Sequence, residues 1–212
     1  CIVTSENARH AELAEACGME WAMHDVQRRA RLLVLVSRQG HCLNDLLYRT
    51  RSRQLRADIA AVVSNHPDYA QLAGSYDVPF HHLPVDAANR AEQERAILDL
   101  VEREQVDLVV LARYMQILSP GLCEALAGRV INIHHSFLPS FKGAQPYHQA
   151  HARGVKIIGA TAHYVTADLD EGPIIEQDVE RVDHSRTVED LVALGQDVER
   201  RALARAVRWH AE

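Results

Sequence analysis

The sequence predicts an α/β fold built on a doubly wound, mostly parallel sheet, preceded by the remnant of a small α+β domain. From Leu32 onward, short apolar segments typical of strands alternate with segments of helical spacing, an order that gives parallel strands joined by helices. The last two strand segments are separated by too few residues for a helical crossover, so that pair should be antiparallel. The 212 residues, 47% of them hydrophobic and 25% charged, are enough for one well-packed main domain.

Residues 1–28 are expected to be the end of the small α+β domain. A helix is predicted over 7–17, with an asparagine as its N-cap and a glycine directly after it. Met19–His24 carries a large apolar residue at every second position, which predicts a strand with one buried face. One helix and one strand cannot bury their apolar faces alone. Because the chain also opens at Cys1 rather than Met, we expect the front of this domain to be missing and the main domain to span 29–212.

The first half of the main domain should alternate strands and helices. Leu32–Val36 is continuously apolar, as expected of a central parallel strand covered on both faces. A helix over Leu43–Arg51 and a second strand at Asp58–Val63 follow. After a short helix near Tyr69–Ala73, the strand at Val78–Val85 holds two prolines, which cannot donate to a sheet, so it should lie near an edge.

The second half of the main domain begins with a helix over Asn89–Glu104, whose apolar residues recur at helical spacing. Val106–Leu111 is a strongly apolar strand. The next helix should cover Ser119–Gly128, because proline is tolerated in its first turn and glycine commonly ends a helix. The strand Val130–His134 follows it, and right-handed crossovers between these strands place helices on both faces of the sheet.

The final elements depart from the parallel pattern. A short helix after Pro146 leads to strands at Lys156–Val165 and Ile174–Val182. The connection over Asp168–Pro173 is too short for a helical crossover, which is why these two strands should be antiparallel. Thr187–Trp209 is predicted as the last helix, with its threonine as the N-cap.

Bulk composition argues against several classes of function. The net charge is −6 and the sequence holds no long run of lysine and arginine, which disfavours a nucleic-acid partner. No apolar run approaches the roughly 20 residues that a membrane span needs. No signal peptide is visible either, so we expect a cytoplasmic protein without a membrane partner. The four cysteines are scattered and form no CxxC pair, as is typical of unpaired thiols in a reducing compartment.

Polar side chains at strand ends are the first candidates for a site, because ligands of open α/β sheets bind beyond the carboxyl ends of the strands. Asn132 and His134 are two residues apart at the end of a strand and project from one face. Asp170 lies in the acidic turn between the last two strands. In acyl chemistry an amide can stabilise an oxyanion, an imidazole can move protons and a carboxylate can orient the imidazole or a water. The spacing alone leaves a purely structural role open, since polar residues at strand ends also satisfy backbone groups.

Three separated motifs resemble the folate-dependent formyltransferase and hydrolase superfamily. They are Asn-Ile-His-His-Ser-Phe-Leu-Pro-Ser-Phe-Lys-Gly at 132–143, His-Tyr-Val at 163–165 and Asp-Leu-Asp-Glu-Gly-Pro-Ile-Ile at 168–175. The resemblance covers roughly 29–212 and implies a formyltransferase-like variant of the Rossmann fold. It also implies that Asn132, His134 and Asp170 are the catalytic residues.

Other segments resemble the hydrolases of this superfamily, which act on 10-formyltetrahydrofolate. These segments are 37–47, 112–120 and 143–151. Glycinamide ribonucleotide formyltransferases carry a Gly/Ser-rich phosphate cradle after the first strand, whereas the same loop here, Ser37–Cys42, holds the single glycine Gly40. The resemblance therefore implies hydrolysis of 10-formyltetrahydrofolate, at a linear amide C–N bond, to formate and tetrahydrofolate. It also implies that residues 1–28 belong to an ACT-type domain.

The same resemblance implies a physiological role and the position of the substrate. The reaction would supply formate for purine biosynthesis and balance the one-carbon folate pool, and we expect a homo-oligomer with no permanently bound cofactor. The substrate-binding candidates are Met115, Gln116, Ile117, Leu118, His163, Val165, Thr166, Ala167 and Asp168. Further pocket candidates are His41, Cys42, Lys142 and Gly143.

Other functions stay open at this point. A formyltransferase acting on an amine such as glycinamide ribonucleotide would use the same three residues, and a non-catalytic folate sensor would use the same fold. The acidic composition disfavours a methionyl-tRNA formyltransferase. A nucleophilic Cys42 beside His41 is a further alternative, although a packed thiol at a helix start is the simpler interpretation. No metal is expected, because neither histidine pair has a third ligand at zinc spacing; the pairs are His148 with His151 and the adjacent residues 134–135.

Overall fold

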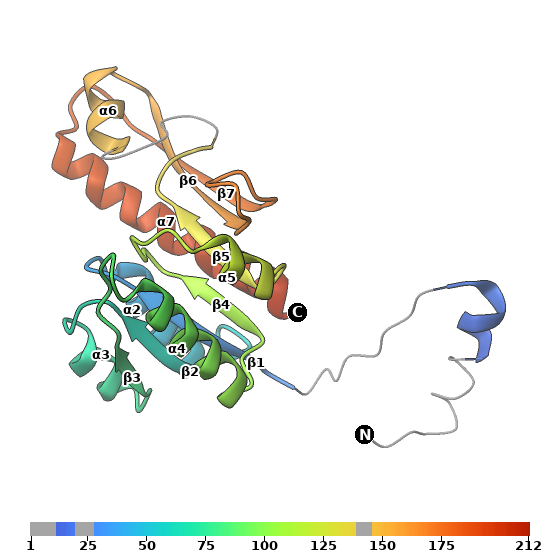
Figure 1. Cartoon of the computed structure of the whole chain (residues 1–212). Coiled ribbons are helices and arrows are strands. Elements are labelled where there is room, and N and C mark those ends of the chain that lie inside the picture. The colour runs from blue at the N-terminus through green and yellow to red at the C-terminus, as the bar shows by residue number, and fades with distance from the viewer. Residues whose placement is uncertain (1–11, 20–27, 139–145) are drawn as a thin grey trace.

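A computed structural model describes residues 12–19, 28–138 and 146–212. Within these residues, seven strands form one sheet in the order β3-β2-β1-β4-β5-β6-β7 (Figure 1). The strands are β1 (Ala30–Val36), β2 (Ala57–Ser64), β3 (Phe80–His82), β4 (Leu108–Leu111), β5 (Val130–His134), β6 (Ile157–Tyr164) and β7 (Ile174–Arg181). The helices of the same region are α2 (His41–Arg51), α3 (Ala70–Ser75), α4 (Arg90–Arg103), α5 (Pro120–Ala125), α6 (Pro146–Ala152) and α7 (Val188–Ala211).

The sheet is parallel through its first five strands and then reverses. β1 pairs in parallel with β2 and β4, β2 with β3, and β4 with β5. β6 pairs antiparallel with β5, and β7 pairs antiparallel with β6. The predicted α/β sheet, mostly parallel with an antiparallel final pair, is confirmed.

Side-chain alternation along β1 divides the core into two layers. Leu32 and Val34 belong to the buried cluster that includes α2 and α7. Leu33 and Leu35 belong to the cluster that includes α4 and α5 on the other face. Helices therefore cover both faces, as a doubly wound sheet requires. The strand order changes direction between β1 and β4, and the carboxyl ends of these two strands form the topological switch point where such sheets bind ligands.

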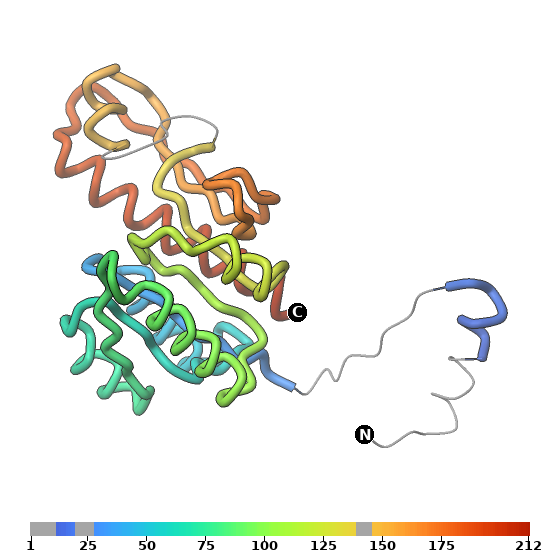
Figure 2. Tube along the Cα trace, in the orientation of Figure 1, coloured from blue at the N-terminus to red at the C-terminus, as the bar shows by residue number. Residues whose placement is uncertain are grey.

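The C-terminal helix α7 runs across β5, β6 and β7 and also contacts α2 and α6 (Figure 2). A capping box fixes its start: the Thr187 hydroxyl accepts a hydrogen bond from the N–H of Asp190, whose carboxylate accepts one from the N–H of Thr187. The predicted N-cap is therefore confirmed. Ser119 caps α5 in the same way, by accepting from the N–H of Leu122. Among the described helices, none is long and apolar enough to cross a membrane.

The predicted strand at Val78–Val85 is much shorter in the structure. Only Phe80–His82 pairs with β2, at the outer edge of the sheet. Pro79 and Pro84 flank these residues, and proline has no N–H to donate to a ladder. The predicted edge position is confirmed, and the predicted length is wrong.

The front of the chain is described only over 12–19. Residues 12–17 are helical, and Gly18 follows them with φ +61°, the left-handed conformation in which glycine ends helices. The predicted N-cap at Asn7 and most of the strand predicted at Met19–His24 lie outside the described residues. The division of the chain between residues 28 and 29 stays a prediction.

Two helical glycines form a matched pair for testing how α7 is packed. A Cβ on Gly195, in α7, would lie 2.1 Å from Cζ of Tyr147, whose ring is buried and whose hydroxyl group is bonded to Glu199. A Cβ on Gly74, in α3, would meet nothing within 4 Å. We expect Gly195→Ala to lower the free energy of unfolding by about 1–3 kcal/mol through overpacking, and Gly74→Ala to raise it by up to about 1 kcal/mol through helix propensity. Denaturant titration checks both, and equal stabilities would contradict this packing.

Candidate active site

A cavity of about 330 Å³ opens at the carboxyl ends of β4 and β5. Its walls come from the segment after β4, the end of β5 and the loop between β6 and β7. The predicted site residues that line it are Met115, Gln116, Ile117, Leu118, Asn132, His134, His163, Val165, Thr166, Ala167 and Asp170. Asp168 is not among the lining residues, whereas Arg113, Tyr114, His135 and Leu169 line the cavity without having been predicted.

The antiparallel pairing of β5 and β6 brings two of these residues together. Asn132 lies directly opposite His163 in the register. Nδ2 of Asn132 is 3.3 Å from Nε2 of His163, and Nδ1 of His163 is 2.9 Å from the carbonyl oxygen of Tyr164. Because a carbonyl oxygen only accepts, Nδ1 of His163 carries a proton and donates it. The His163 ring is thereby fixed at the wall of the cavity.

Asp170 reaches two histidines from the loop after β6. Its Oδ2 is 3.3 Å from Nδ1 of His134, and its Oδ1 is 3.6 Å from Nε2 of His163. Hydrogen bonding to His134, and then to His163, holds the pKa of Asp170 far below its usual range, so the carboxylate stays charged. Asp170 has φ +58°, a left-handed conformation that costs about 1–2 kcal/mol outside glycine. Such strain persists where the position of a side chain matters.

One nitrogen of His134 is left without a partner. Its Nδ1 faces Asp170, whereas its Nε2 is buried and has no hydrogen-bond partner among the described residues. Buried polar atoms are normally hydrogen-bonded, so an unpartnered one beside a cavity indicates a group reserved for a ligand. Asn132 projects from the same face of β5, two residues earlier. The amide and the imidazole can therefore act on the same polar atom of a ligand.

A buried carboxylate lies behind this cavity. Glu199 of α7 is only 1% exposed. Its Oε2 is 2.8 Å from Nε2 of His41 and 3.4 Å from Nε of Arg113, and its Oε1 accepts a hydrogen bond from the Tyr147 hydroxyl at 2.7 Å. Burial acts to raise the pKa of Glu199, but His41 and Arg113 outweigh burial and hold it below its usual value. Glu199 is therefore charged, and its partners come from α2, α6 and the segment after β4.

Arg113 lies at the switch point between β1 and β4. Its carbonyl oxygen accepts a hydrogen bond from the N–H of Ser37, just after β1, and its Nε and Nη2 donate to Oε1 of Gln39 at 3.0 and 2.7 Å. Its backbone is left-handed, with φ +64°. A second cavity of about 450 Å³ opens here and shares Arg113, Met115 and His135 with the first. The two cavities are neighbours across these three residues.

Of the four further pocket candidates, Lys142 and Gly143 lie outside the described residues. His41 and Cys42 line neither cavity. Burial, and then the nearby Glu199, raise the pKa of Cys42 well above its usual value. The thiol therefore stays protonated, which disfavours the cysteine nucleophile weighed from the sequence.

The fold brings together three potential metal ligands that the histidine pairs in the sequence did not indicate. One donor atom each of His41, Cys42 and Glu199 lies within 4.8 Å of the others. This set suits a cation poorly, because the Arg113 guanidinium is 3.4 Å from the Glu199 carboxylate and the thiol keeps its proton. We therefore interpret these three residues as packing and charge compensation.

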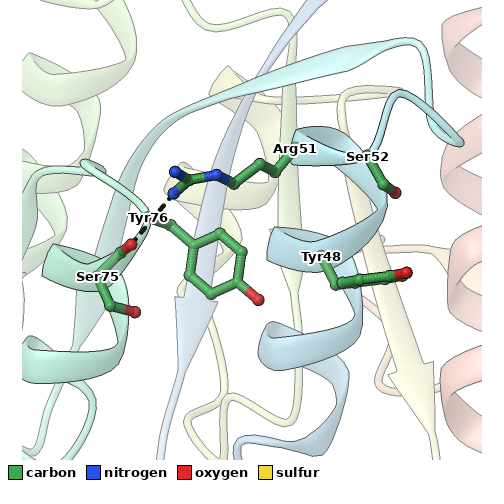
Figure 3. A pocket seen from close by; sticks show the side chains of 5 residues that line it. All are labelled: Tyr48, Arg51, Ser52, Ser75 and Tyr76. Atoms are coloured by element: carbon green, nitrogen blue, oxygen red, sulfur yellow. Dashed lines mark hydrogen bonds between the residues drawn. The ribbon is translucent and has the colours of Figure 1, made fainter.

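A third cavity, of about 430 Å³, is lined by residues of α2 and α3 and residues directly after these helices, none of them a catalytic candidate (Figure 3). Arg51, at the end of α2, donates to the carbonyl oxygen of Ser75, at the end of α3, and its guanidinium lies 5.6 Å from the centre of the Tyr76 ring. Tyr48 and Ser52 complete the lining. None of these five side chains is a carboxylate or an imidazole. The cavity lies at the ends of α2 and α3, and these helices start, rather than end, near the carboxyl ends of the strands before them. The first cavity is therefore the candidate active site.

The sequence patterns did not mark Arg113, His135 or Glu199 as site residues. Arg113 closely follows a predicted strand, and His135 is next to a predicted catalytic residue, so position at a strand end was the signal available for both. Glu199 offered no signal, because a glutamate within a helix is most often exposed. Its burial follows only from the packing of α7 against α2 and α6.

Comparison with known proteins shows relatives along nearly the whole chain. The model of the family described as Formyl transferase matches residues 30–207. The chain is 51% identical, over 211 residues, to the formyltetrahydrofolate deformylase of Corynebacterium sp. (strain P-1), a match that covers 100% of the chain and 74% of that protein. A crystal structure of formyltetrahydrofolate deformylase from Burkholderia mallei is 57% identical with a TM-score of 0.91, over 97% of this chain and 74% of that one. Glycinamide ribonucleotide transformylase 1 from Symbiobacterium toebii is 34% identical with a TM-score of 0.81, over 91% and 92%.

Replacing Glu199 tests the buried charge. Glu199→Gln keeps the shape but leaves the Arg113 guanidinium without its anion, so we expect the free energy of unfolding at pH 7 to fall by about 3 kcal/mol. Because the folded-state pKa of Glu199 is lowered, its contribution is fully present above the unfolded pKa of about 4.3 and is lost as pH falls through the folded value. The stability difference between wild type and variant should therefore shrink below about pH 4.

Denaturant unfolding at several pH values measures this difference. Glu124→Gln is the control, since Glu124 is exposed, and it should stay within about 0.5 kcal/mol of wild type. A Glu199→Gln protein as stable as wild type, or a difference that does not change with pH, would contradict the charged state of Glu199.

Proposed function

The chain belongs to the formyl transferase family, and we propose that it hydrolyses 10-formyltetrahydrofolate to formate and tetrahydrofolate. The likeness to formyltetrahydrofolate deformylases carries this proposal, because it extends over nearly the whole chain in both sequence and fold. The reaction cleaves a linear amide C–N bond. It would supply formate for purine biosynthesis and adjust the one-carbon folate pool.

We assign the chemistry to Asn132, His134 and Asp170. Water attacks the formyl carbon on N10, and the carbonyl oxygen of the formyl group takes up negative charge. The Asn132 amide and Nε2 of His134 donate to that oxygen. Asp170 accepts from Nδ1 of His134 and so orients the ring; for Nε2 to donate to the oxyanion as well, the ring carries a proton on both nitrogens throughout this step. The unpartnered Nε2 of His134 supports this assignment, since the developing oxyanion would supply its missing partner.

The first cavity is the proposed place of the pterin ring. Met115 and Ile117 are large apolar side chains that are 60% and 59% exposed, and a ring bound beside them would remove that surface from water. The proposed contacts are Met115, Gln116, Ile117, Leu118, His163, Val165, Thr166, Ala167 and Asp168. Asp168 would act indirectly. Its carbonyl oxygen accepts a hydrogen bond from the Thr166 hydroxyl and so shapes the loop beside the cavity.

The loop after β1 favours hydrolysis over transfer to a ribonucleotide. A phosphate group would bind at the N-terminus of α2, where backbone N–H groups are free of helical partners. The Tyr69 ring covers that end: a Cβ on Gly40 would lie 2.3 Å from Cε1 of Tyr69, whose hydroxyl donates to the carbonyl oxygen of Arg38 at 2.7 Å. The one glycine of this loop therefore makes room for a tyrosine ring rather than for a phosphate.

The expectations about domains, assembly, location and cofactor also stay proposals. A non-catalytic folate sensor is disfavoured, because a sensor has no need of proton-transfer groups around its ligand. The family match begins at residue 30, which supports a domain boundary near residues 28 and 29, and we propose an ACT-type origin for the segment before it. We also propose a homo-oligomer that acts in the cytoplasm without a permanently bound cofactor.

Asp170→Asn removes the charge of the carboxylate and little of its shape. We expect kcat for formate release to fall by about 100-fold or more, because the imidazole loses the anion that orients and stabilises it. The KM for 10-formyltetrahydrofolate should stay within about threefold. Formate release can be followed with formate dehydrogenase. Asp99→Asn is the control, since Asp99 is an exposed carboxylate of α4.

Asp170→Asn also separates catalysis from a purely structural role. If Asp170 only shapes its loop, thermal stability should drop while turnover per folded molecule is kept. That outcome would remove Asp170 from the catalytic set.

Adding an amine separates hydrolysis from formyl transfer. We expect formate release without any amine, and an unchanged rate when glycinamide ribonucleotide is added, because the covered start of α2 offers its phosphate no site. Mass spectrometry can quantify formate and formylated amine in one reaction. Transfer to the amine at a rate above that of hydrolysis would show that the protein is a transferase.

A further inference from the structure

A second imidazole lies between the two cavities. His135 follows His134 directly and lines both cavities. The centre of its ring is 5.4 Å from that of His134 and 6.3 Å from that of Tyr147. Among the described residues, none forms a hydrogen bond with its ring nitrogens. As far as the described residues go, these nitrogens can meet water or a ligand in either cavity.

Charged and polar groups face His135 from four directions. Arg113 faces it from the segment after β4, Glu199 from α7, Tyr147 from α6, and Asp170 with His134 from the first cavity. Burial, and then the Arg113 guanidinium, lower the pKa of His135 to about 4, although Glu199 and Asp170 act in the opposite direction. The ring is neutral at physiological pH, with a free lone pair. Its basicity is close to that of an ordinary carboxylate, whose pKa is about 4.3.

The three assigned catalytic residues leave the hydrolysis without a proton acceptor for the water. Asn132 and His134 donate to the formyl oxygen, and a nitrogen that donates there cannot accept a proton at the same moment. Asp170 lies 3.3 Å from Nδ1 of His134, and its pKa lies far below the usual range, so it is a very weak base. A further group must take the proton.

We propose that His135 is the general base of the hydrolysis and that the attacking water reaches it through the second cavity. The inference rests on the proposed function. The water oxygen forms a bond to the formyl carbon while its proton moves to a ring nitrogen of His135, and the C=O electron pair moves onto oxygen beside Asn132 and His134. The tetrahedral intermediate then collapses: the C–N10 bond breaks, its electrons go to N10, and N10 takes the proton back from His135. The formic acid released loses its proton to solvent.

The second cavity gives water a route to His135. Gln39, His148 and Gln196 are among its lining residues and offer polar partners to water. A volume of about 450 Å³ holds several waters, which need two to four polar partners each. The first cavity has large apolar side chains along one wall and would be occupied by the substrate. Water entering from the far side of His135 therefore meets the base before it meets the formyl carbon.

His135→Gln and His135→Ala test the base, with His151→Gln as the control at an exposed histidine of α6. We expect kcat for formate release to fall by about 100-fold or more in both His135 variants, because general bases contribute at least that factor. The KM for 10-formyltetrahydrofolate should stay within about threefold, and the control should match wild type. Free imidazole should restore part of the activity of His135→Ala, which also proves that this variant is folded.

The pH dependence gives an independent readout. With a base of pKa about 4, kcat of the wild type should stay flat between about pH 7.5 and 5.5. A base with the ordinary imidazole pKa of about 6.5 would lose about 90% of its activity by pH 5.5. Such a loss would assign the base to another histidine.

The route of the water is tested at the wall of the second cavity. Gln196→Trp should narrow the cavity, lower kcat and weaken the imidazole rescue of His135→Ala, whereas Asp197→Trp, at the exposed neighbour, should do neither. Unchanged kcat and rescue in Gln196→Trp would exclude this route. Near wild-type kcat in folded His135→Gln, or no rescue of His135→Ala by imidazole, would exclude His135 as the base. A wild-type protein that releases no formate would instead refute the proposed function itself.

Discussion

One buried charge, the carboxylate of Glu199, joins parts of the fold that are far apart in the chain. An unpartnered carboxylate at this depth would cost several kcal/mol, so its position requires His41, Arg113 and Tyr147 to stand around it. The Tyr147 ring that reaches it occupies the space a side chain at position 195 would need, which is why a glycine stands there in α7. The packing of α7, one wall of the second cavity and the orientation of Arg113 thus share one electrostatic origin.

The reversal of the sheet at β6 imposes the second constraint. Antiparallel pairing sets His163 opposite Asn132, and the loop that follows folds back so that Asp170 reaches His134. The loop can close only over a glycine, because a Cβ at Gly172 would lie 1.7 Å from the carbonyl oxygen of Tyr164. The local strain at Asp170, with its positive φ, is stabilised by the two histidines that it contacts. The geometry of the candidate site is therefore a product of strand direction as much as of residue identity.

What the sequence predicted well follows from local rules. Apolar runs, capping residues and strand-end positions are local, and they placed Val130–His134, the cap at Thr187 and the antiparallel final pair correctly. The features that the sequence could not predict are contacts between residues far apart in the chain. Glu199 and His41 are 158 residues apart, and no local pattern marks a helical glutamate as buried. The shortening of β3 depends on both local and distant features. The prolines that cause it are visible in the sequence, but their effect depends on which N–H groups the pairing with β2 requires.

Adjacent residues at the end of β5 experience opposite electrostatic environments, and this bears on the choice between water and an amine. His134 lies 3.3 Å from the Asp170 carboxylate, whereas burial and the Arg113 guanidinium lower the pKa of His135. An amine attacks a formyl carbon through its own lone pair and loses its proton afterwards. Water has a pKa of about 15.7 and becomes a competent nucleophile only as a base removes its proton. Hydrolysis therefore requires a proton acceptor at the moment of attack, whereas transfer to an amine requires one only afterwards, and the acceptor for water must stay neutral beside a charged site. In the proposed mechanism His135 is this acceptor, because the residue that follows His134 lies beside Arg113 and the second cavity, both away from the Asp170 carboxylate.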